Sequence, residues 1–313
     1  MSKKLDNPSR LLVDVVLVIV AVVWGSGYSL ATIALNGGFP VTLVLAVRFV
    51  VGTLVMLVLF GRQMASATKD EIKYGGITGL ILFLAFFLET TGLSYTTPSK
   101  NAFLTCSNVI LVPFVYWLFS KRRPSAVTCL GVLVCFSGIA VLSYSPDMGF
   151  SLNIGDIISI IAAFGYAFHL CSLNYALEKC RNFQIVNIMQ LGVVGVLGSL
   201  MFLFKDLKNF DPASLKVGLL PCIIMGFFST AFCYCLQSWA QKHASPTETS
   251  VILSLELVSG SGFSVLVGLE KLTPNLVIGG AIILAAIILT QLDSIRQLKK
   301  QNETLAKEAG IKD

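Results

Sequence analysis

Charged residues are scarce in this chain. Asp, Glu, Lys and Arg make up 13% of its 313 residues, while hydrophobic residues make up 55%. An average soluble domain carries about twice this share of charge. So few charged side chains cannot cover the surface of a water-soluble protein of this length, and the composition excludes that class.

Groups that carry catalysis or bind metals are equally few. The two histidines, His169 and His243, stand in no HExxH pattern, and neither a GxSxG motif nor a glycine-rich phosphate loop occurs. All of the eight cysteines except Cys180 fall within apolar runs, which is typical of packing residues and not of a disulfide framework. We therefore expect no enzyme activity, no metal site and no cofactor.

Long apolar runs are what the sequence does contain. Each has about twenty residues, the length at which a helix crosses about 30 Å of hydrocarbon. The sequence therefore predicts an all-α membrane protein, embedded in a lipid bilayer, with ten transmembrane helices. Their approximate ranges are 12–35, 40–60, 72–95, 99–119, 124–143, 155–177, 185–204, 214–241, 246–268 and 273–292.

The basic residues are distributed unevenly between these runs. A formal net charge of +6 invites a nucleic-acid partner. With the N-terminus inside, however, most Lys and Arg residues fall at cytoplasmic helix ends. The outer side holds only Lys100, Lys205, Lys208, Lys216 and Lys271. This positive-inside bias predicts a multi-pass protein of the cytoplasmic (plasma) membrane, with both termini cytoplasmic and no nucleic-acid partner.

The chain also matches itself. A shift of 148 residues aligns Pro98 with Pro246, and both copies open a helix with a Ser/Thr-Pro start, at 97–100 and 245–248. Nearer the start of each copy the shift becomes 142 and aligns Trp24 with Tyr166, Gly27 with His169 and Arg48 with Gln190.

Five spans per copy is an odd number, so the two repeats, residues 1–147 and 148–292, must have opposite orientations in the membrane. Inverted repeats are typical of alternating-access transporters, whose substrate site lies near the midplane between the repeats. We therefore expect the two five-helix repeats to surround a central cavity.

Polar residues at membrane depth are candidates for this site, because each is costly unless it faces a cavity or a partner. Glu256 and Asn108 lie near the midplane and are equivalent at the shift of 148 residues. Asn101, Thr105 and Asn108 recur at helical spacing and form one polar stripe, which we expect to face the cavity. The alternative is a stripe that joins helices by hydrogen bonds. Ser259 follows Glu256 at similar depth.

Three further ionisable residues lie within the spans. Arg48 and Glu89 have similar depth, which predicts a structural or gating pair between the second and third helices. Glu256 is then left uncompensated, and we interpret it as the group that binds the cationic part of a substrate or a coupling proton. The alternative is a protonated Glu256 that joins helices. His169 is a candidate coupling group or a packing residue.

Two glycine pairs and three aromatic residues complete the candidate site. Gly25 and Gly27 would let the first helix loosen near the midplane, and the segment 260–262 would do the same in the ninth; the alternative is close helix packing. The rings of Trp24, Tyr28 and Tyr166 suit an amine through cation–π attraction, or an apolar solute.

Short motifs carry a family resemblance. They are Trp24-Gly25-Ser26, Arg48-Phe49, Gly92-Leu93-Ser94-Tyr95-Thr96, Leu255-Glu256 and Gly268-Leu269-Glu270-Lys271-Leu272. With these residues the chain resembles the ten-helix, EamA-like branch of the drug/metabolite transporter superfamily over nearly its whole length. Leu257 stands where many relatives have proline, which removes the usual cause of a kink there.

The resemblance implies a secondary transporter that moves a small metabolite, such as an amino acid, an amine or a related solute, across the cytoplasmic membrane by alternating access. An importer of a cationic amine such as a choline-like compound is an alternative. A non-transport receptor or scaffold is another, and the inverted repeat counts against it. The expected partners are a small-molecule substrate, the bilayer and a coupling proton or cation, and we expect a monomer.

The chain after the last span has a different pattern. Ile295, Leu298, Leu305 and Ala309 recur at heptad-like spacing among charged residues. This pattern predicts a cytoplasmic amphipathic tail over residues 293–313.

Overall fold

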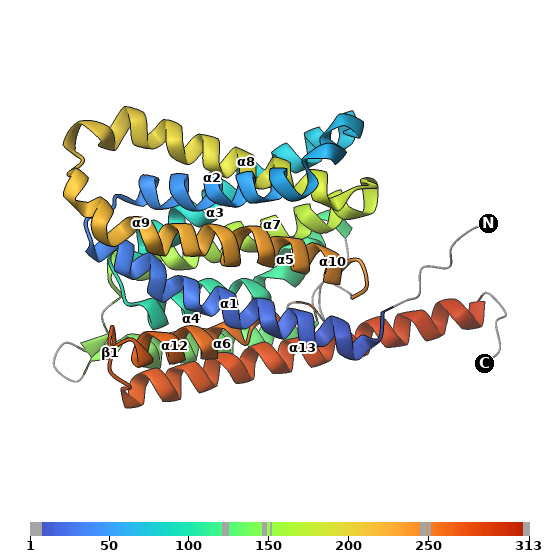
Figure 1. Ribbon diagram of the computed structural model, residues 1–313. Coiled ribbons are helices and arrows are strands. Elements are labelled where there is room, and N and C mark those ends of the chain that lie inside the picture. The colour runs from blue at the N-terminus through green and yellow to red at the C-terminus, as the bar shows by residue number, and fades with distance from the viewer. Residues whose placement is uncertain are drawn as a thin grey trace.

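The computed structural model describes residues 8–120, 125–145, 149–150, 152–244, 249 and 252–308. Its long helices run side by side between two ends of the molecule (Figure 1). We call the end at which α1 (Arg10–Asn36) begins the near end, and the end at which α1 stops the far end.

The described secondary structure of the first repeat is helical up to its last connection. After α1 it contains α2 (Val41–Phe60), η1 (Gly61–Ser66), α3 (Lys69–Leu93), α4 (Pro98–Cys106), α5 (Asn108–Ser120) and α6 (Ala126–Ser143). A two-residue antiparallel pair, β1 (Tyr144–Ser145) with β2 (Gly149–Phe150), then leads at the far end to the second repeat.

The second repeat contains a corresponding series of helices. They are α7 (Ile154–Lys179), α8 (Phe183–Met201), η2 (Phe202–Asp206), η3 (Leu207–Asn209), η4 (Pro212–Ser214), α9 (Leu215–Ile224), η5 (Met225–Phe232), α10 (Cys233–Gln241), α12 (Glu256–Leu266) and α13 (Pro274–Glu308). The expected Ser-Pro helix start at 245–248 lies outside the described residues.

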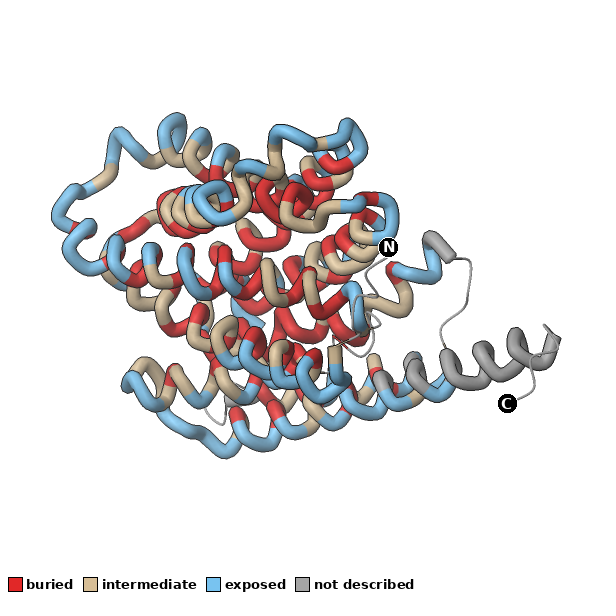
Figure 2. The backbone as a smooth tube through the Cα atoms, turned by 45° about the vertical axis from the view of Figure 1, so that its right-hand side comes forward, coloured by how far each residue is buried: buried red, intermediate tan, exposed pale blue. Residues whose placement is uncertain are grey.

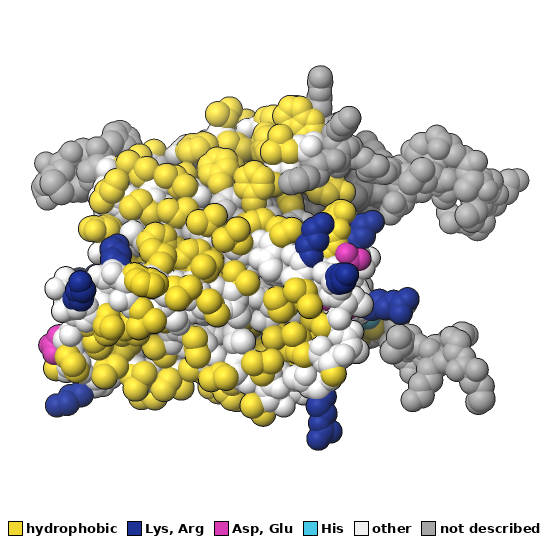
Figure 3. Space-filling view, turned by 90° about the horizontal axis from the view of Figure 1, so that it is seen from above, with side chains coloured by type: hydrophobic (Ala, Val, Ile, Leu, Met, Phe, Trp, Pro, Cys, Tyr) yellow, Lys and Arg dark blue, Asp and Glu magenta, His cyan; other side chains and the backbone are white. Residues whose placement is uncertain are grey.

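The helices have the length and surface of membrane spans. Among the described residues, seven helical segments are long and apolar enough to cross a bilayer, and two shorter apolar stretches lie in α6 and α13. Apolar side chains cover the middle of the face in Figure 3, and Lys and Arg gather toward its two ends. Buried residues lie mainly on the inner sides of the helices (Figure 2). An apolar outer surface is the inverse of a soluble fold and fits contact with lipid.

The two repeats run in opposite directions. In Figure 1, α1 begins at the near end whereas α7 begins at the far end. The most extensive helix contacts cross between the repeats: α3 packs on α7, α2 on α8, α6 on α13 and α1 on α12. The all-α membrane fold with two inverted repeats is therefore confirmed.

Two spans are broken at equivalent points, where the sequence predicts continuous helices. The fourth span is interrupted at Ser107, between α4 and α5, and the ninth at Ser254 and Leu255, just before α12. Asn108 and Glu256 therefore each stand as the first residue of a half-helix. Position 257, just after the second break, is a leucine. The break therefore forms without the proline that would usually cause a kink there.

The expectation that glycines loosen the first and ninth helices is wrong. α1 is continuous through Gly25 and Gly27, and α12 is continuous through Gly260. A Cβ on Gly25 would lie 2.1 Å from Ser259 Oγ and 2.6 Å from the Gly260 nitrogen. The missing side chain instead lets α1 and α12 approach closely, which is the packing role that was the alternative.

The last helix is longer than predicted. α13 continues without interruption from Pro274 to Glu308, so a single helix includes most of the expected tail. Near the beginning of this extension, Asp293 accepts a hydrogen bond from Ser125 at the start of α6. Residues 309–313 lie outside the described part of the chain.

Candidate functional site

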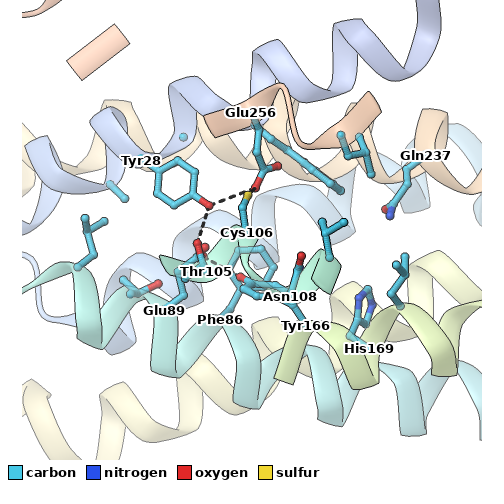
Figure 4. A pocket seen from close by; sticks show the side chains of 18 of the residues that line it. Tyr28, Phe86, Glu89, Thr105, Cys106, Asn108, Tyr166, His169, Gln237 and Glu256 are labelled. Carbon is cyan, nitrogen blue, oxygen red and sulfur yellow. Dashed lines mark hydrogen bonds between the residues drawn. The ribbon is translucent and has the colours of Figure 1, made fainter. Parts of the chain in front are cut away.

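A cavity of about 110 Å³ lies inside the helix bundle. Residues of both repeats line it, and the close-up in Figure 4 shows their side chains converging from several helices. A space of this volume holds several water molecules or a small solute. The lining includes Trp24, Tyr28, Arg48, Phe86, Glu89, Thr105, Cys106, Asn108, Tyr166, His169, Tyr234, Gln237 and Glu256.

Glu256 reaches the cavity as the first residue of α12. Its Oε1 accepts hydrogen bonds from the Tyr28 hydroxyl at 3.2 Å and the Cys106 thiol at 2.7 Å. Among the described residues, no partner is recorded for its other carboxylate oxygen, Oε2. A carboxylate is stabilised at a helix N-terminus by the helix dipole. One of the two carboxylate oxygens is therefore held in place by two donors.

Asn108 stands opposite in the inverted repeat, as the first residue of α5. It lines the same cavity as Glu256. The inverted pair therefore presents a neutral amide from one repeat and a carboxylate from the other. Thr105, one turn earlier, also lines the cavity, and its hydroxyl lies 3.0 Å from that of Tyr28.

Glu89 is a second carboxylate of the cavity, contributed by α3. Its Oε2 accepts a 2.7 Å hydrogen bond from the Tyr166 hydroxyl, and the Tyr166 ring packs edge-on against Phe86. α7 places Tyr166 here because α3 and α7 are closely packed.

Arg48 and Glu89, which the sequence predicts as a structural or gating pair, both line the cavity. The Nε of Arg48 donates to Thr230 Oγ1 at 3.0 Å, and its guanidinium lies 4.6 Å from the centre of the Phe86 ring. The described residues contain no ion pair between Arg48 and Glu89. The cavity thus holds a cation and two carboxylates that are bound by different neighbours.

A π-helical segment, η5, anchors two of these residues. The Trp24 indole donates to the Ser229 carbonyl at 2.7 Å, and the next residue of η5, Thr230, accepts from Arg48. A π-helix widens the backbone and changes which carbonyls face inward, and such segments are frequent at functional sites. Pro221, within α9, precedes this segment.

His169 connects the cavity to a buried polar chain. Its Nε2 lies 3.0 Å from Gln190 Oε1, and the Gln190 amide donates to Asn187 Oδ1 at 2.7 Å. Ser238 of α10 donates to the same Asn187 oxygen at 3.0 Å. These bonds join α7, α8 and α10 on the near-end side of the cavity.

Two of the predicted site residues do not line the cavity. The Asn101 amide donates to the Glu89 carbonyl at 3.2 Å and to Ser159 Oγ at 2.7 Å. The Ser259 hydroxyl donates to the Ala21 carbonyl at 3.1 Å. Both side chains join helices by hydrogen bonds, which was the alternative for Asn101, because neighbouring helices close the cavity at their levels.

The structure also brings in residues that the sequence analysis did not select. Cys106, Phe86, Tyr234 and Gln237 line the cavity, and Thr230 holds Arg48. Only Gln237 carried a visible signal, since it is a polar residue inside an apolar run. Cys106 was assigned to packing, and its bond to Glu256 depends on the break at Ser107.

The lining of the cavity combines several kinds of side chain. Within the described ranges, no three His, Cys, Asp or Glu side chains lie close enough together to hold a metal ion. Aromatic rings, hydroxyls, amides and two carboxylates instead surround a space for a small solute, a pattern common in solute sites.

Comparisons with known proteins agree with this architecture. The sequence profile of the EamA-like transporter family matches the chain twice, over residues 11–144 and 153–292. A curated protein of Archaeoglobus fulgidus, named an uncharacterized transporter, is 31% identical over 288 residues, which are 92% of this chain and 88% of that one. An uncharacterized transporter of Clostridium kluyveri is 21% identical and covers 87% and 88% of the two chains.

A solved structure shares the fold. It has a TM-score of 0.65 with 17% sequence identity, and the match covers 92% of this chain and 99% of the other. Its title, "Crystal structure of protein", gives no activity.

Proposed function

Because the chain belongs to the EamA-like transporter family, we propose that it is a secondary transporter of small amine-bearing metabolites that works by alternating access. The main support for an amine-bearing substrate is the Glu256 carboxylate in the central cavity. Tyr28 and Cys106 fix one of its oxygens, and the other has no recorded partner among the described residues.

The surroundings of Glu256 favour a cation. A carboxylate inside a membrane protein is costly unless a charge or a hydrogen-bond donor compensates it. Arg48 is held by Thr230 and Phe86 and does not pair with either carboxylate. A protonated amine would supply the missing positive charge. The same carboxylate is the candidate carrier of a coupling proton or cation.

The aromatic residues would bind the body of the solute. Trp24 packs against Tyr234 with ring centres 5.5 Å apart, and Tyr166 lies against Phe86 at 5.4 Å. Ring faces attract ammonium groups and also bind apolar groups. Asn108 and Thr105 would add hydrogen bonds from the opposite repeat. A solute with a positively charged nitrogen and a small body would fit these residues. The proposed substrate class therefore includes amino acids, simple amines and choline-like compounds.

Support for alternating access comes from the contacts at the far end. Asp156 of α7 accepts from Lys100 Nζ at 2.6 Å and from Thr96 Oγ1 at 2.7 Å. Glu270 accepts from the Ser99 nitrogen at 2.9 Å. Both carboxylates belong to the second repeat and hold the start of α4, whose other end reaches the cavity. We name these bonds the far-end contacts, and in the proposed cycle they break to open that end.

The proposed orientation follows the charge distribution of the sequence. Among the described residues, most of the basic ones fall at the near end, where α1 begins and α13 ends (Figure 1). The positive-inside rule then assigns the near end and both termini to the cytoplasm and the protein to the cytoplasmic membrane.

A thermal-shift screen of purified protein tests the substrate class. The panel contains amino acids, primary amines, quaternary amines and nucleosides at equal concentrations. We expect compounds with a positively charged nitrogen to raise the melting temperature, because a ligand stabilises the state that binds it. The same compounds should give no shift with Glu256→Gln. Stabilisation by neutral nucleosides alone, or an unchanged shift with Glu256→Gln, would contradict the proposal.

A further inference from the structure

Two buried glutamines on α10 have side-chain atoms without a hydrogen-bond partner among the described residues. Gln237 is 3% exposed and Gln241 is 7% exposed. Gln237 Oε1, and both the oxygen and the nitrogen of the Gln241 side chain, have no partner. Buried amides are almost always bonded in folded proteins, so each exception requires a reason.

Packing alone is an unfavourable explanation for a side-chain amide, which has two donor hydrogens and an acceptor oxygen to satisfy. Removing an amide from water without a replacement hydrogen bond is energetically costly. Inside a membrane protein, unbonded polar groups are tolerated where they face a water-filled space or a path for solute. The two glutamines thus mark a place that water or solute reaches during part of the working cycle.

The two glutamines lie between the central cavity and the near end of the molecule. They are four residues apart, so they occupy the same face of α10 and are separated by about one helical turn. Gln237 lines the central cavity. Directly after Gln241, Lys242 and His243 line a second hollow of about 360 Å³ at the near end, together with Arg10 and Asp14 of the α1 region.

The other faces of α10 are occupied. Ala240 and Cys233 belong to an apolar cluster with Leu17 and Val20 of α1. Ser238 is bonded to Asn187 of α8. Only the face with Gln237 and Gln241 therefore combines polar side chains with unused hydrogen-bonding groups among the described residues of this helix.

We propose that the solute path between the central cavity and the near end follows this face of α10, with Gln237 and Gln241 as successive hydrogen-bonding contacts. This inference rests on the proposed transport function. The near-end hollow is the mouth of the path, and the one turn of α10 between the hollow and the cavity is the part that opens.

Cysteine labelling in proteoliposomes tests the path. Gln241→Cys is treated with a membrane-impermeant, positively charged methanethiosulfonate reagent, and peptide mass spectrometry measures the labelling rate. Ala240→Cys and Ser238→Cys are the matched controls, because both native residues are fully buried on neighbouring faces of the same helix. We expect Gln241→Cys to react at least about tenfold faster than either control, since a packed site reacts only after costly local opening.

Equal rates for Gln241→Cys and Ala240→Cys would overturn the path. The native Cys106, which lines the cavity, is measured in the same samples. A labelled Cys106 with an unreactive Gln241→Cys would reject the α10 path and leave the proposed cavity intact. No labelling at either position would contradict both proposals. If Gln241→Cys does not fold, Gln237→Cys replaces it with the same expected ratio.

Discussion

At the scale of single residues, the cavity holds its charged groups by separate anchors. Thr230 binds Arg48, Tyr166 binds Glu89, and Tyr28 binds Glu256. All three of these partners are neutral side chains. Arg48, Glu89 and Glu256 are therefore not held by direct ion pairs. A ligand with its own charge can therefore interact with the site without first breaking an ion pair.

The anchor of Arg48 gives a first prediction. Thr230→Val keeps the side-chain shape but removes the oxygen that accepts from Arg48. Leaving a buried charged donor unsatisfied costs about 1–3 kcal/mol. We expect a lower melting temperature in detergent, measured by intrinsic fluorescence.

Thr32→Val is the matched control for this prediction. The Thr32 hydroxyl is buried and has no partner among the described residues, so its removal should leave the melting temperature unchanged or raised. An equal loss in both variants would show that the bond to Arg48 contributes nothing particular to stability.

The candidate site was only partly predictable from single residues. Depth in the membrane and the internal repeat were enough to select Glu256 and Asn108. The inward direction of Asn101 was inferred from a continuous helix, whereas α4 ends at Cys106 and α3 and α7 close over Asn101. The direction of a side chain next to a helix break depends on how the neighbouring helices pack. A single sequence shows no pattern from which that packing can be predicted.

At the scale of elements, the contact between α1 and α12 depends on the absence of a side chain. Gly25→Ala would place a Cβ 2.1 Å from Ser259 Oγ and 2.9 Å from the Glu256 carbonyl. The two helices would have to separate, and Glu256 would move with α12. We therefore predict a lower melting temperature and weaker binding of the amines found in the thermal-shift screen.

Gly262→Ala is the control on α12 itself. A Cβ there meets nothing within 4 Å, and alanine favours a helix over glycine by about 1 kcal/mol. This variant should be as stable as the parent or more stable. Equal destabilisation by both changes would contradict the close-packing account of Gly25.

Apart from the extended α13, the helix boundaries lie close to the ends of the apolar runs, but the runs did not reveal the two helix breaks. Neither break has a proline at the point of interruption: Ser107 divides the fourth span, and Ser254 and Leu255 precede α12. Each span is one apolar run, and an apolar run does not show where its helix is interrupted. The π-helical turn of η5 was missed for the same reason.

At the scale of the whole molecule, the far-end contacts should control access to the cavity. Glu270→Gln and Asp156→Asn each weaken the bonds that hold the start of α4. We predict that the native Cys106 then reacts severalfold faster with an impermeant thiol reagent, because α4 is released more often. Subtracting the labelling of a Cys106→Ser background isolates the signal of this residue.

Asp211→Asn is the control for these variants, since Asp211 only caps a short turn in the loop before α9. Its Cys106 labelling rate should equal that of the parent protein. Unchanged rates in both Glu270→Gln and Asp156→Asn would remove the far-end contacts from the proposed cycle.

The most direct test of the whole account is transport by Glu256→Gln in proteoliposomes, using the amine that gives the largest thermal shift. Glu178→Gln, which changes an exposed carboxylate at the end of α7, is the matched control. Losing a buried ion pair with the substrate costs about 2–5 kcal/mol, which corresponds to more than about tenfold in binding. The account predicts that Glu256→Gln folds but loses at least this much uptake at limiting substrate, while Glu178→Gln transports normally. Uptake by Glu256→Gln at the parental rate would contradict it.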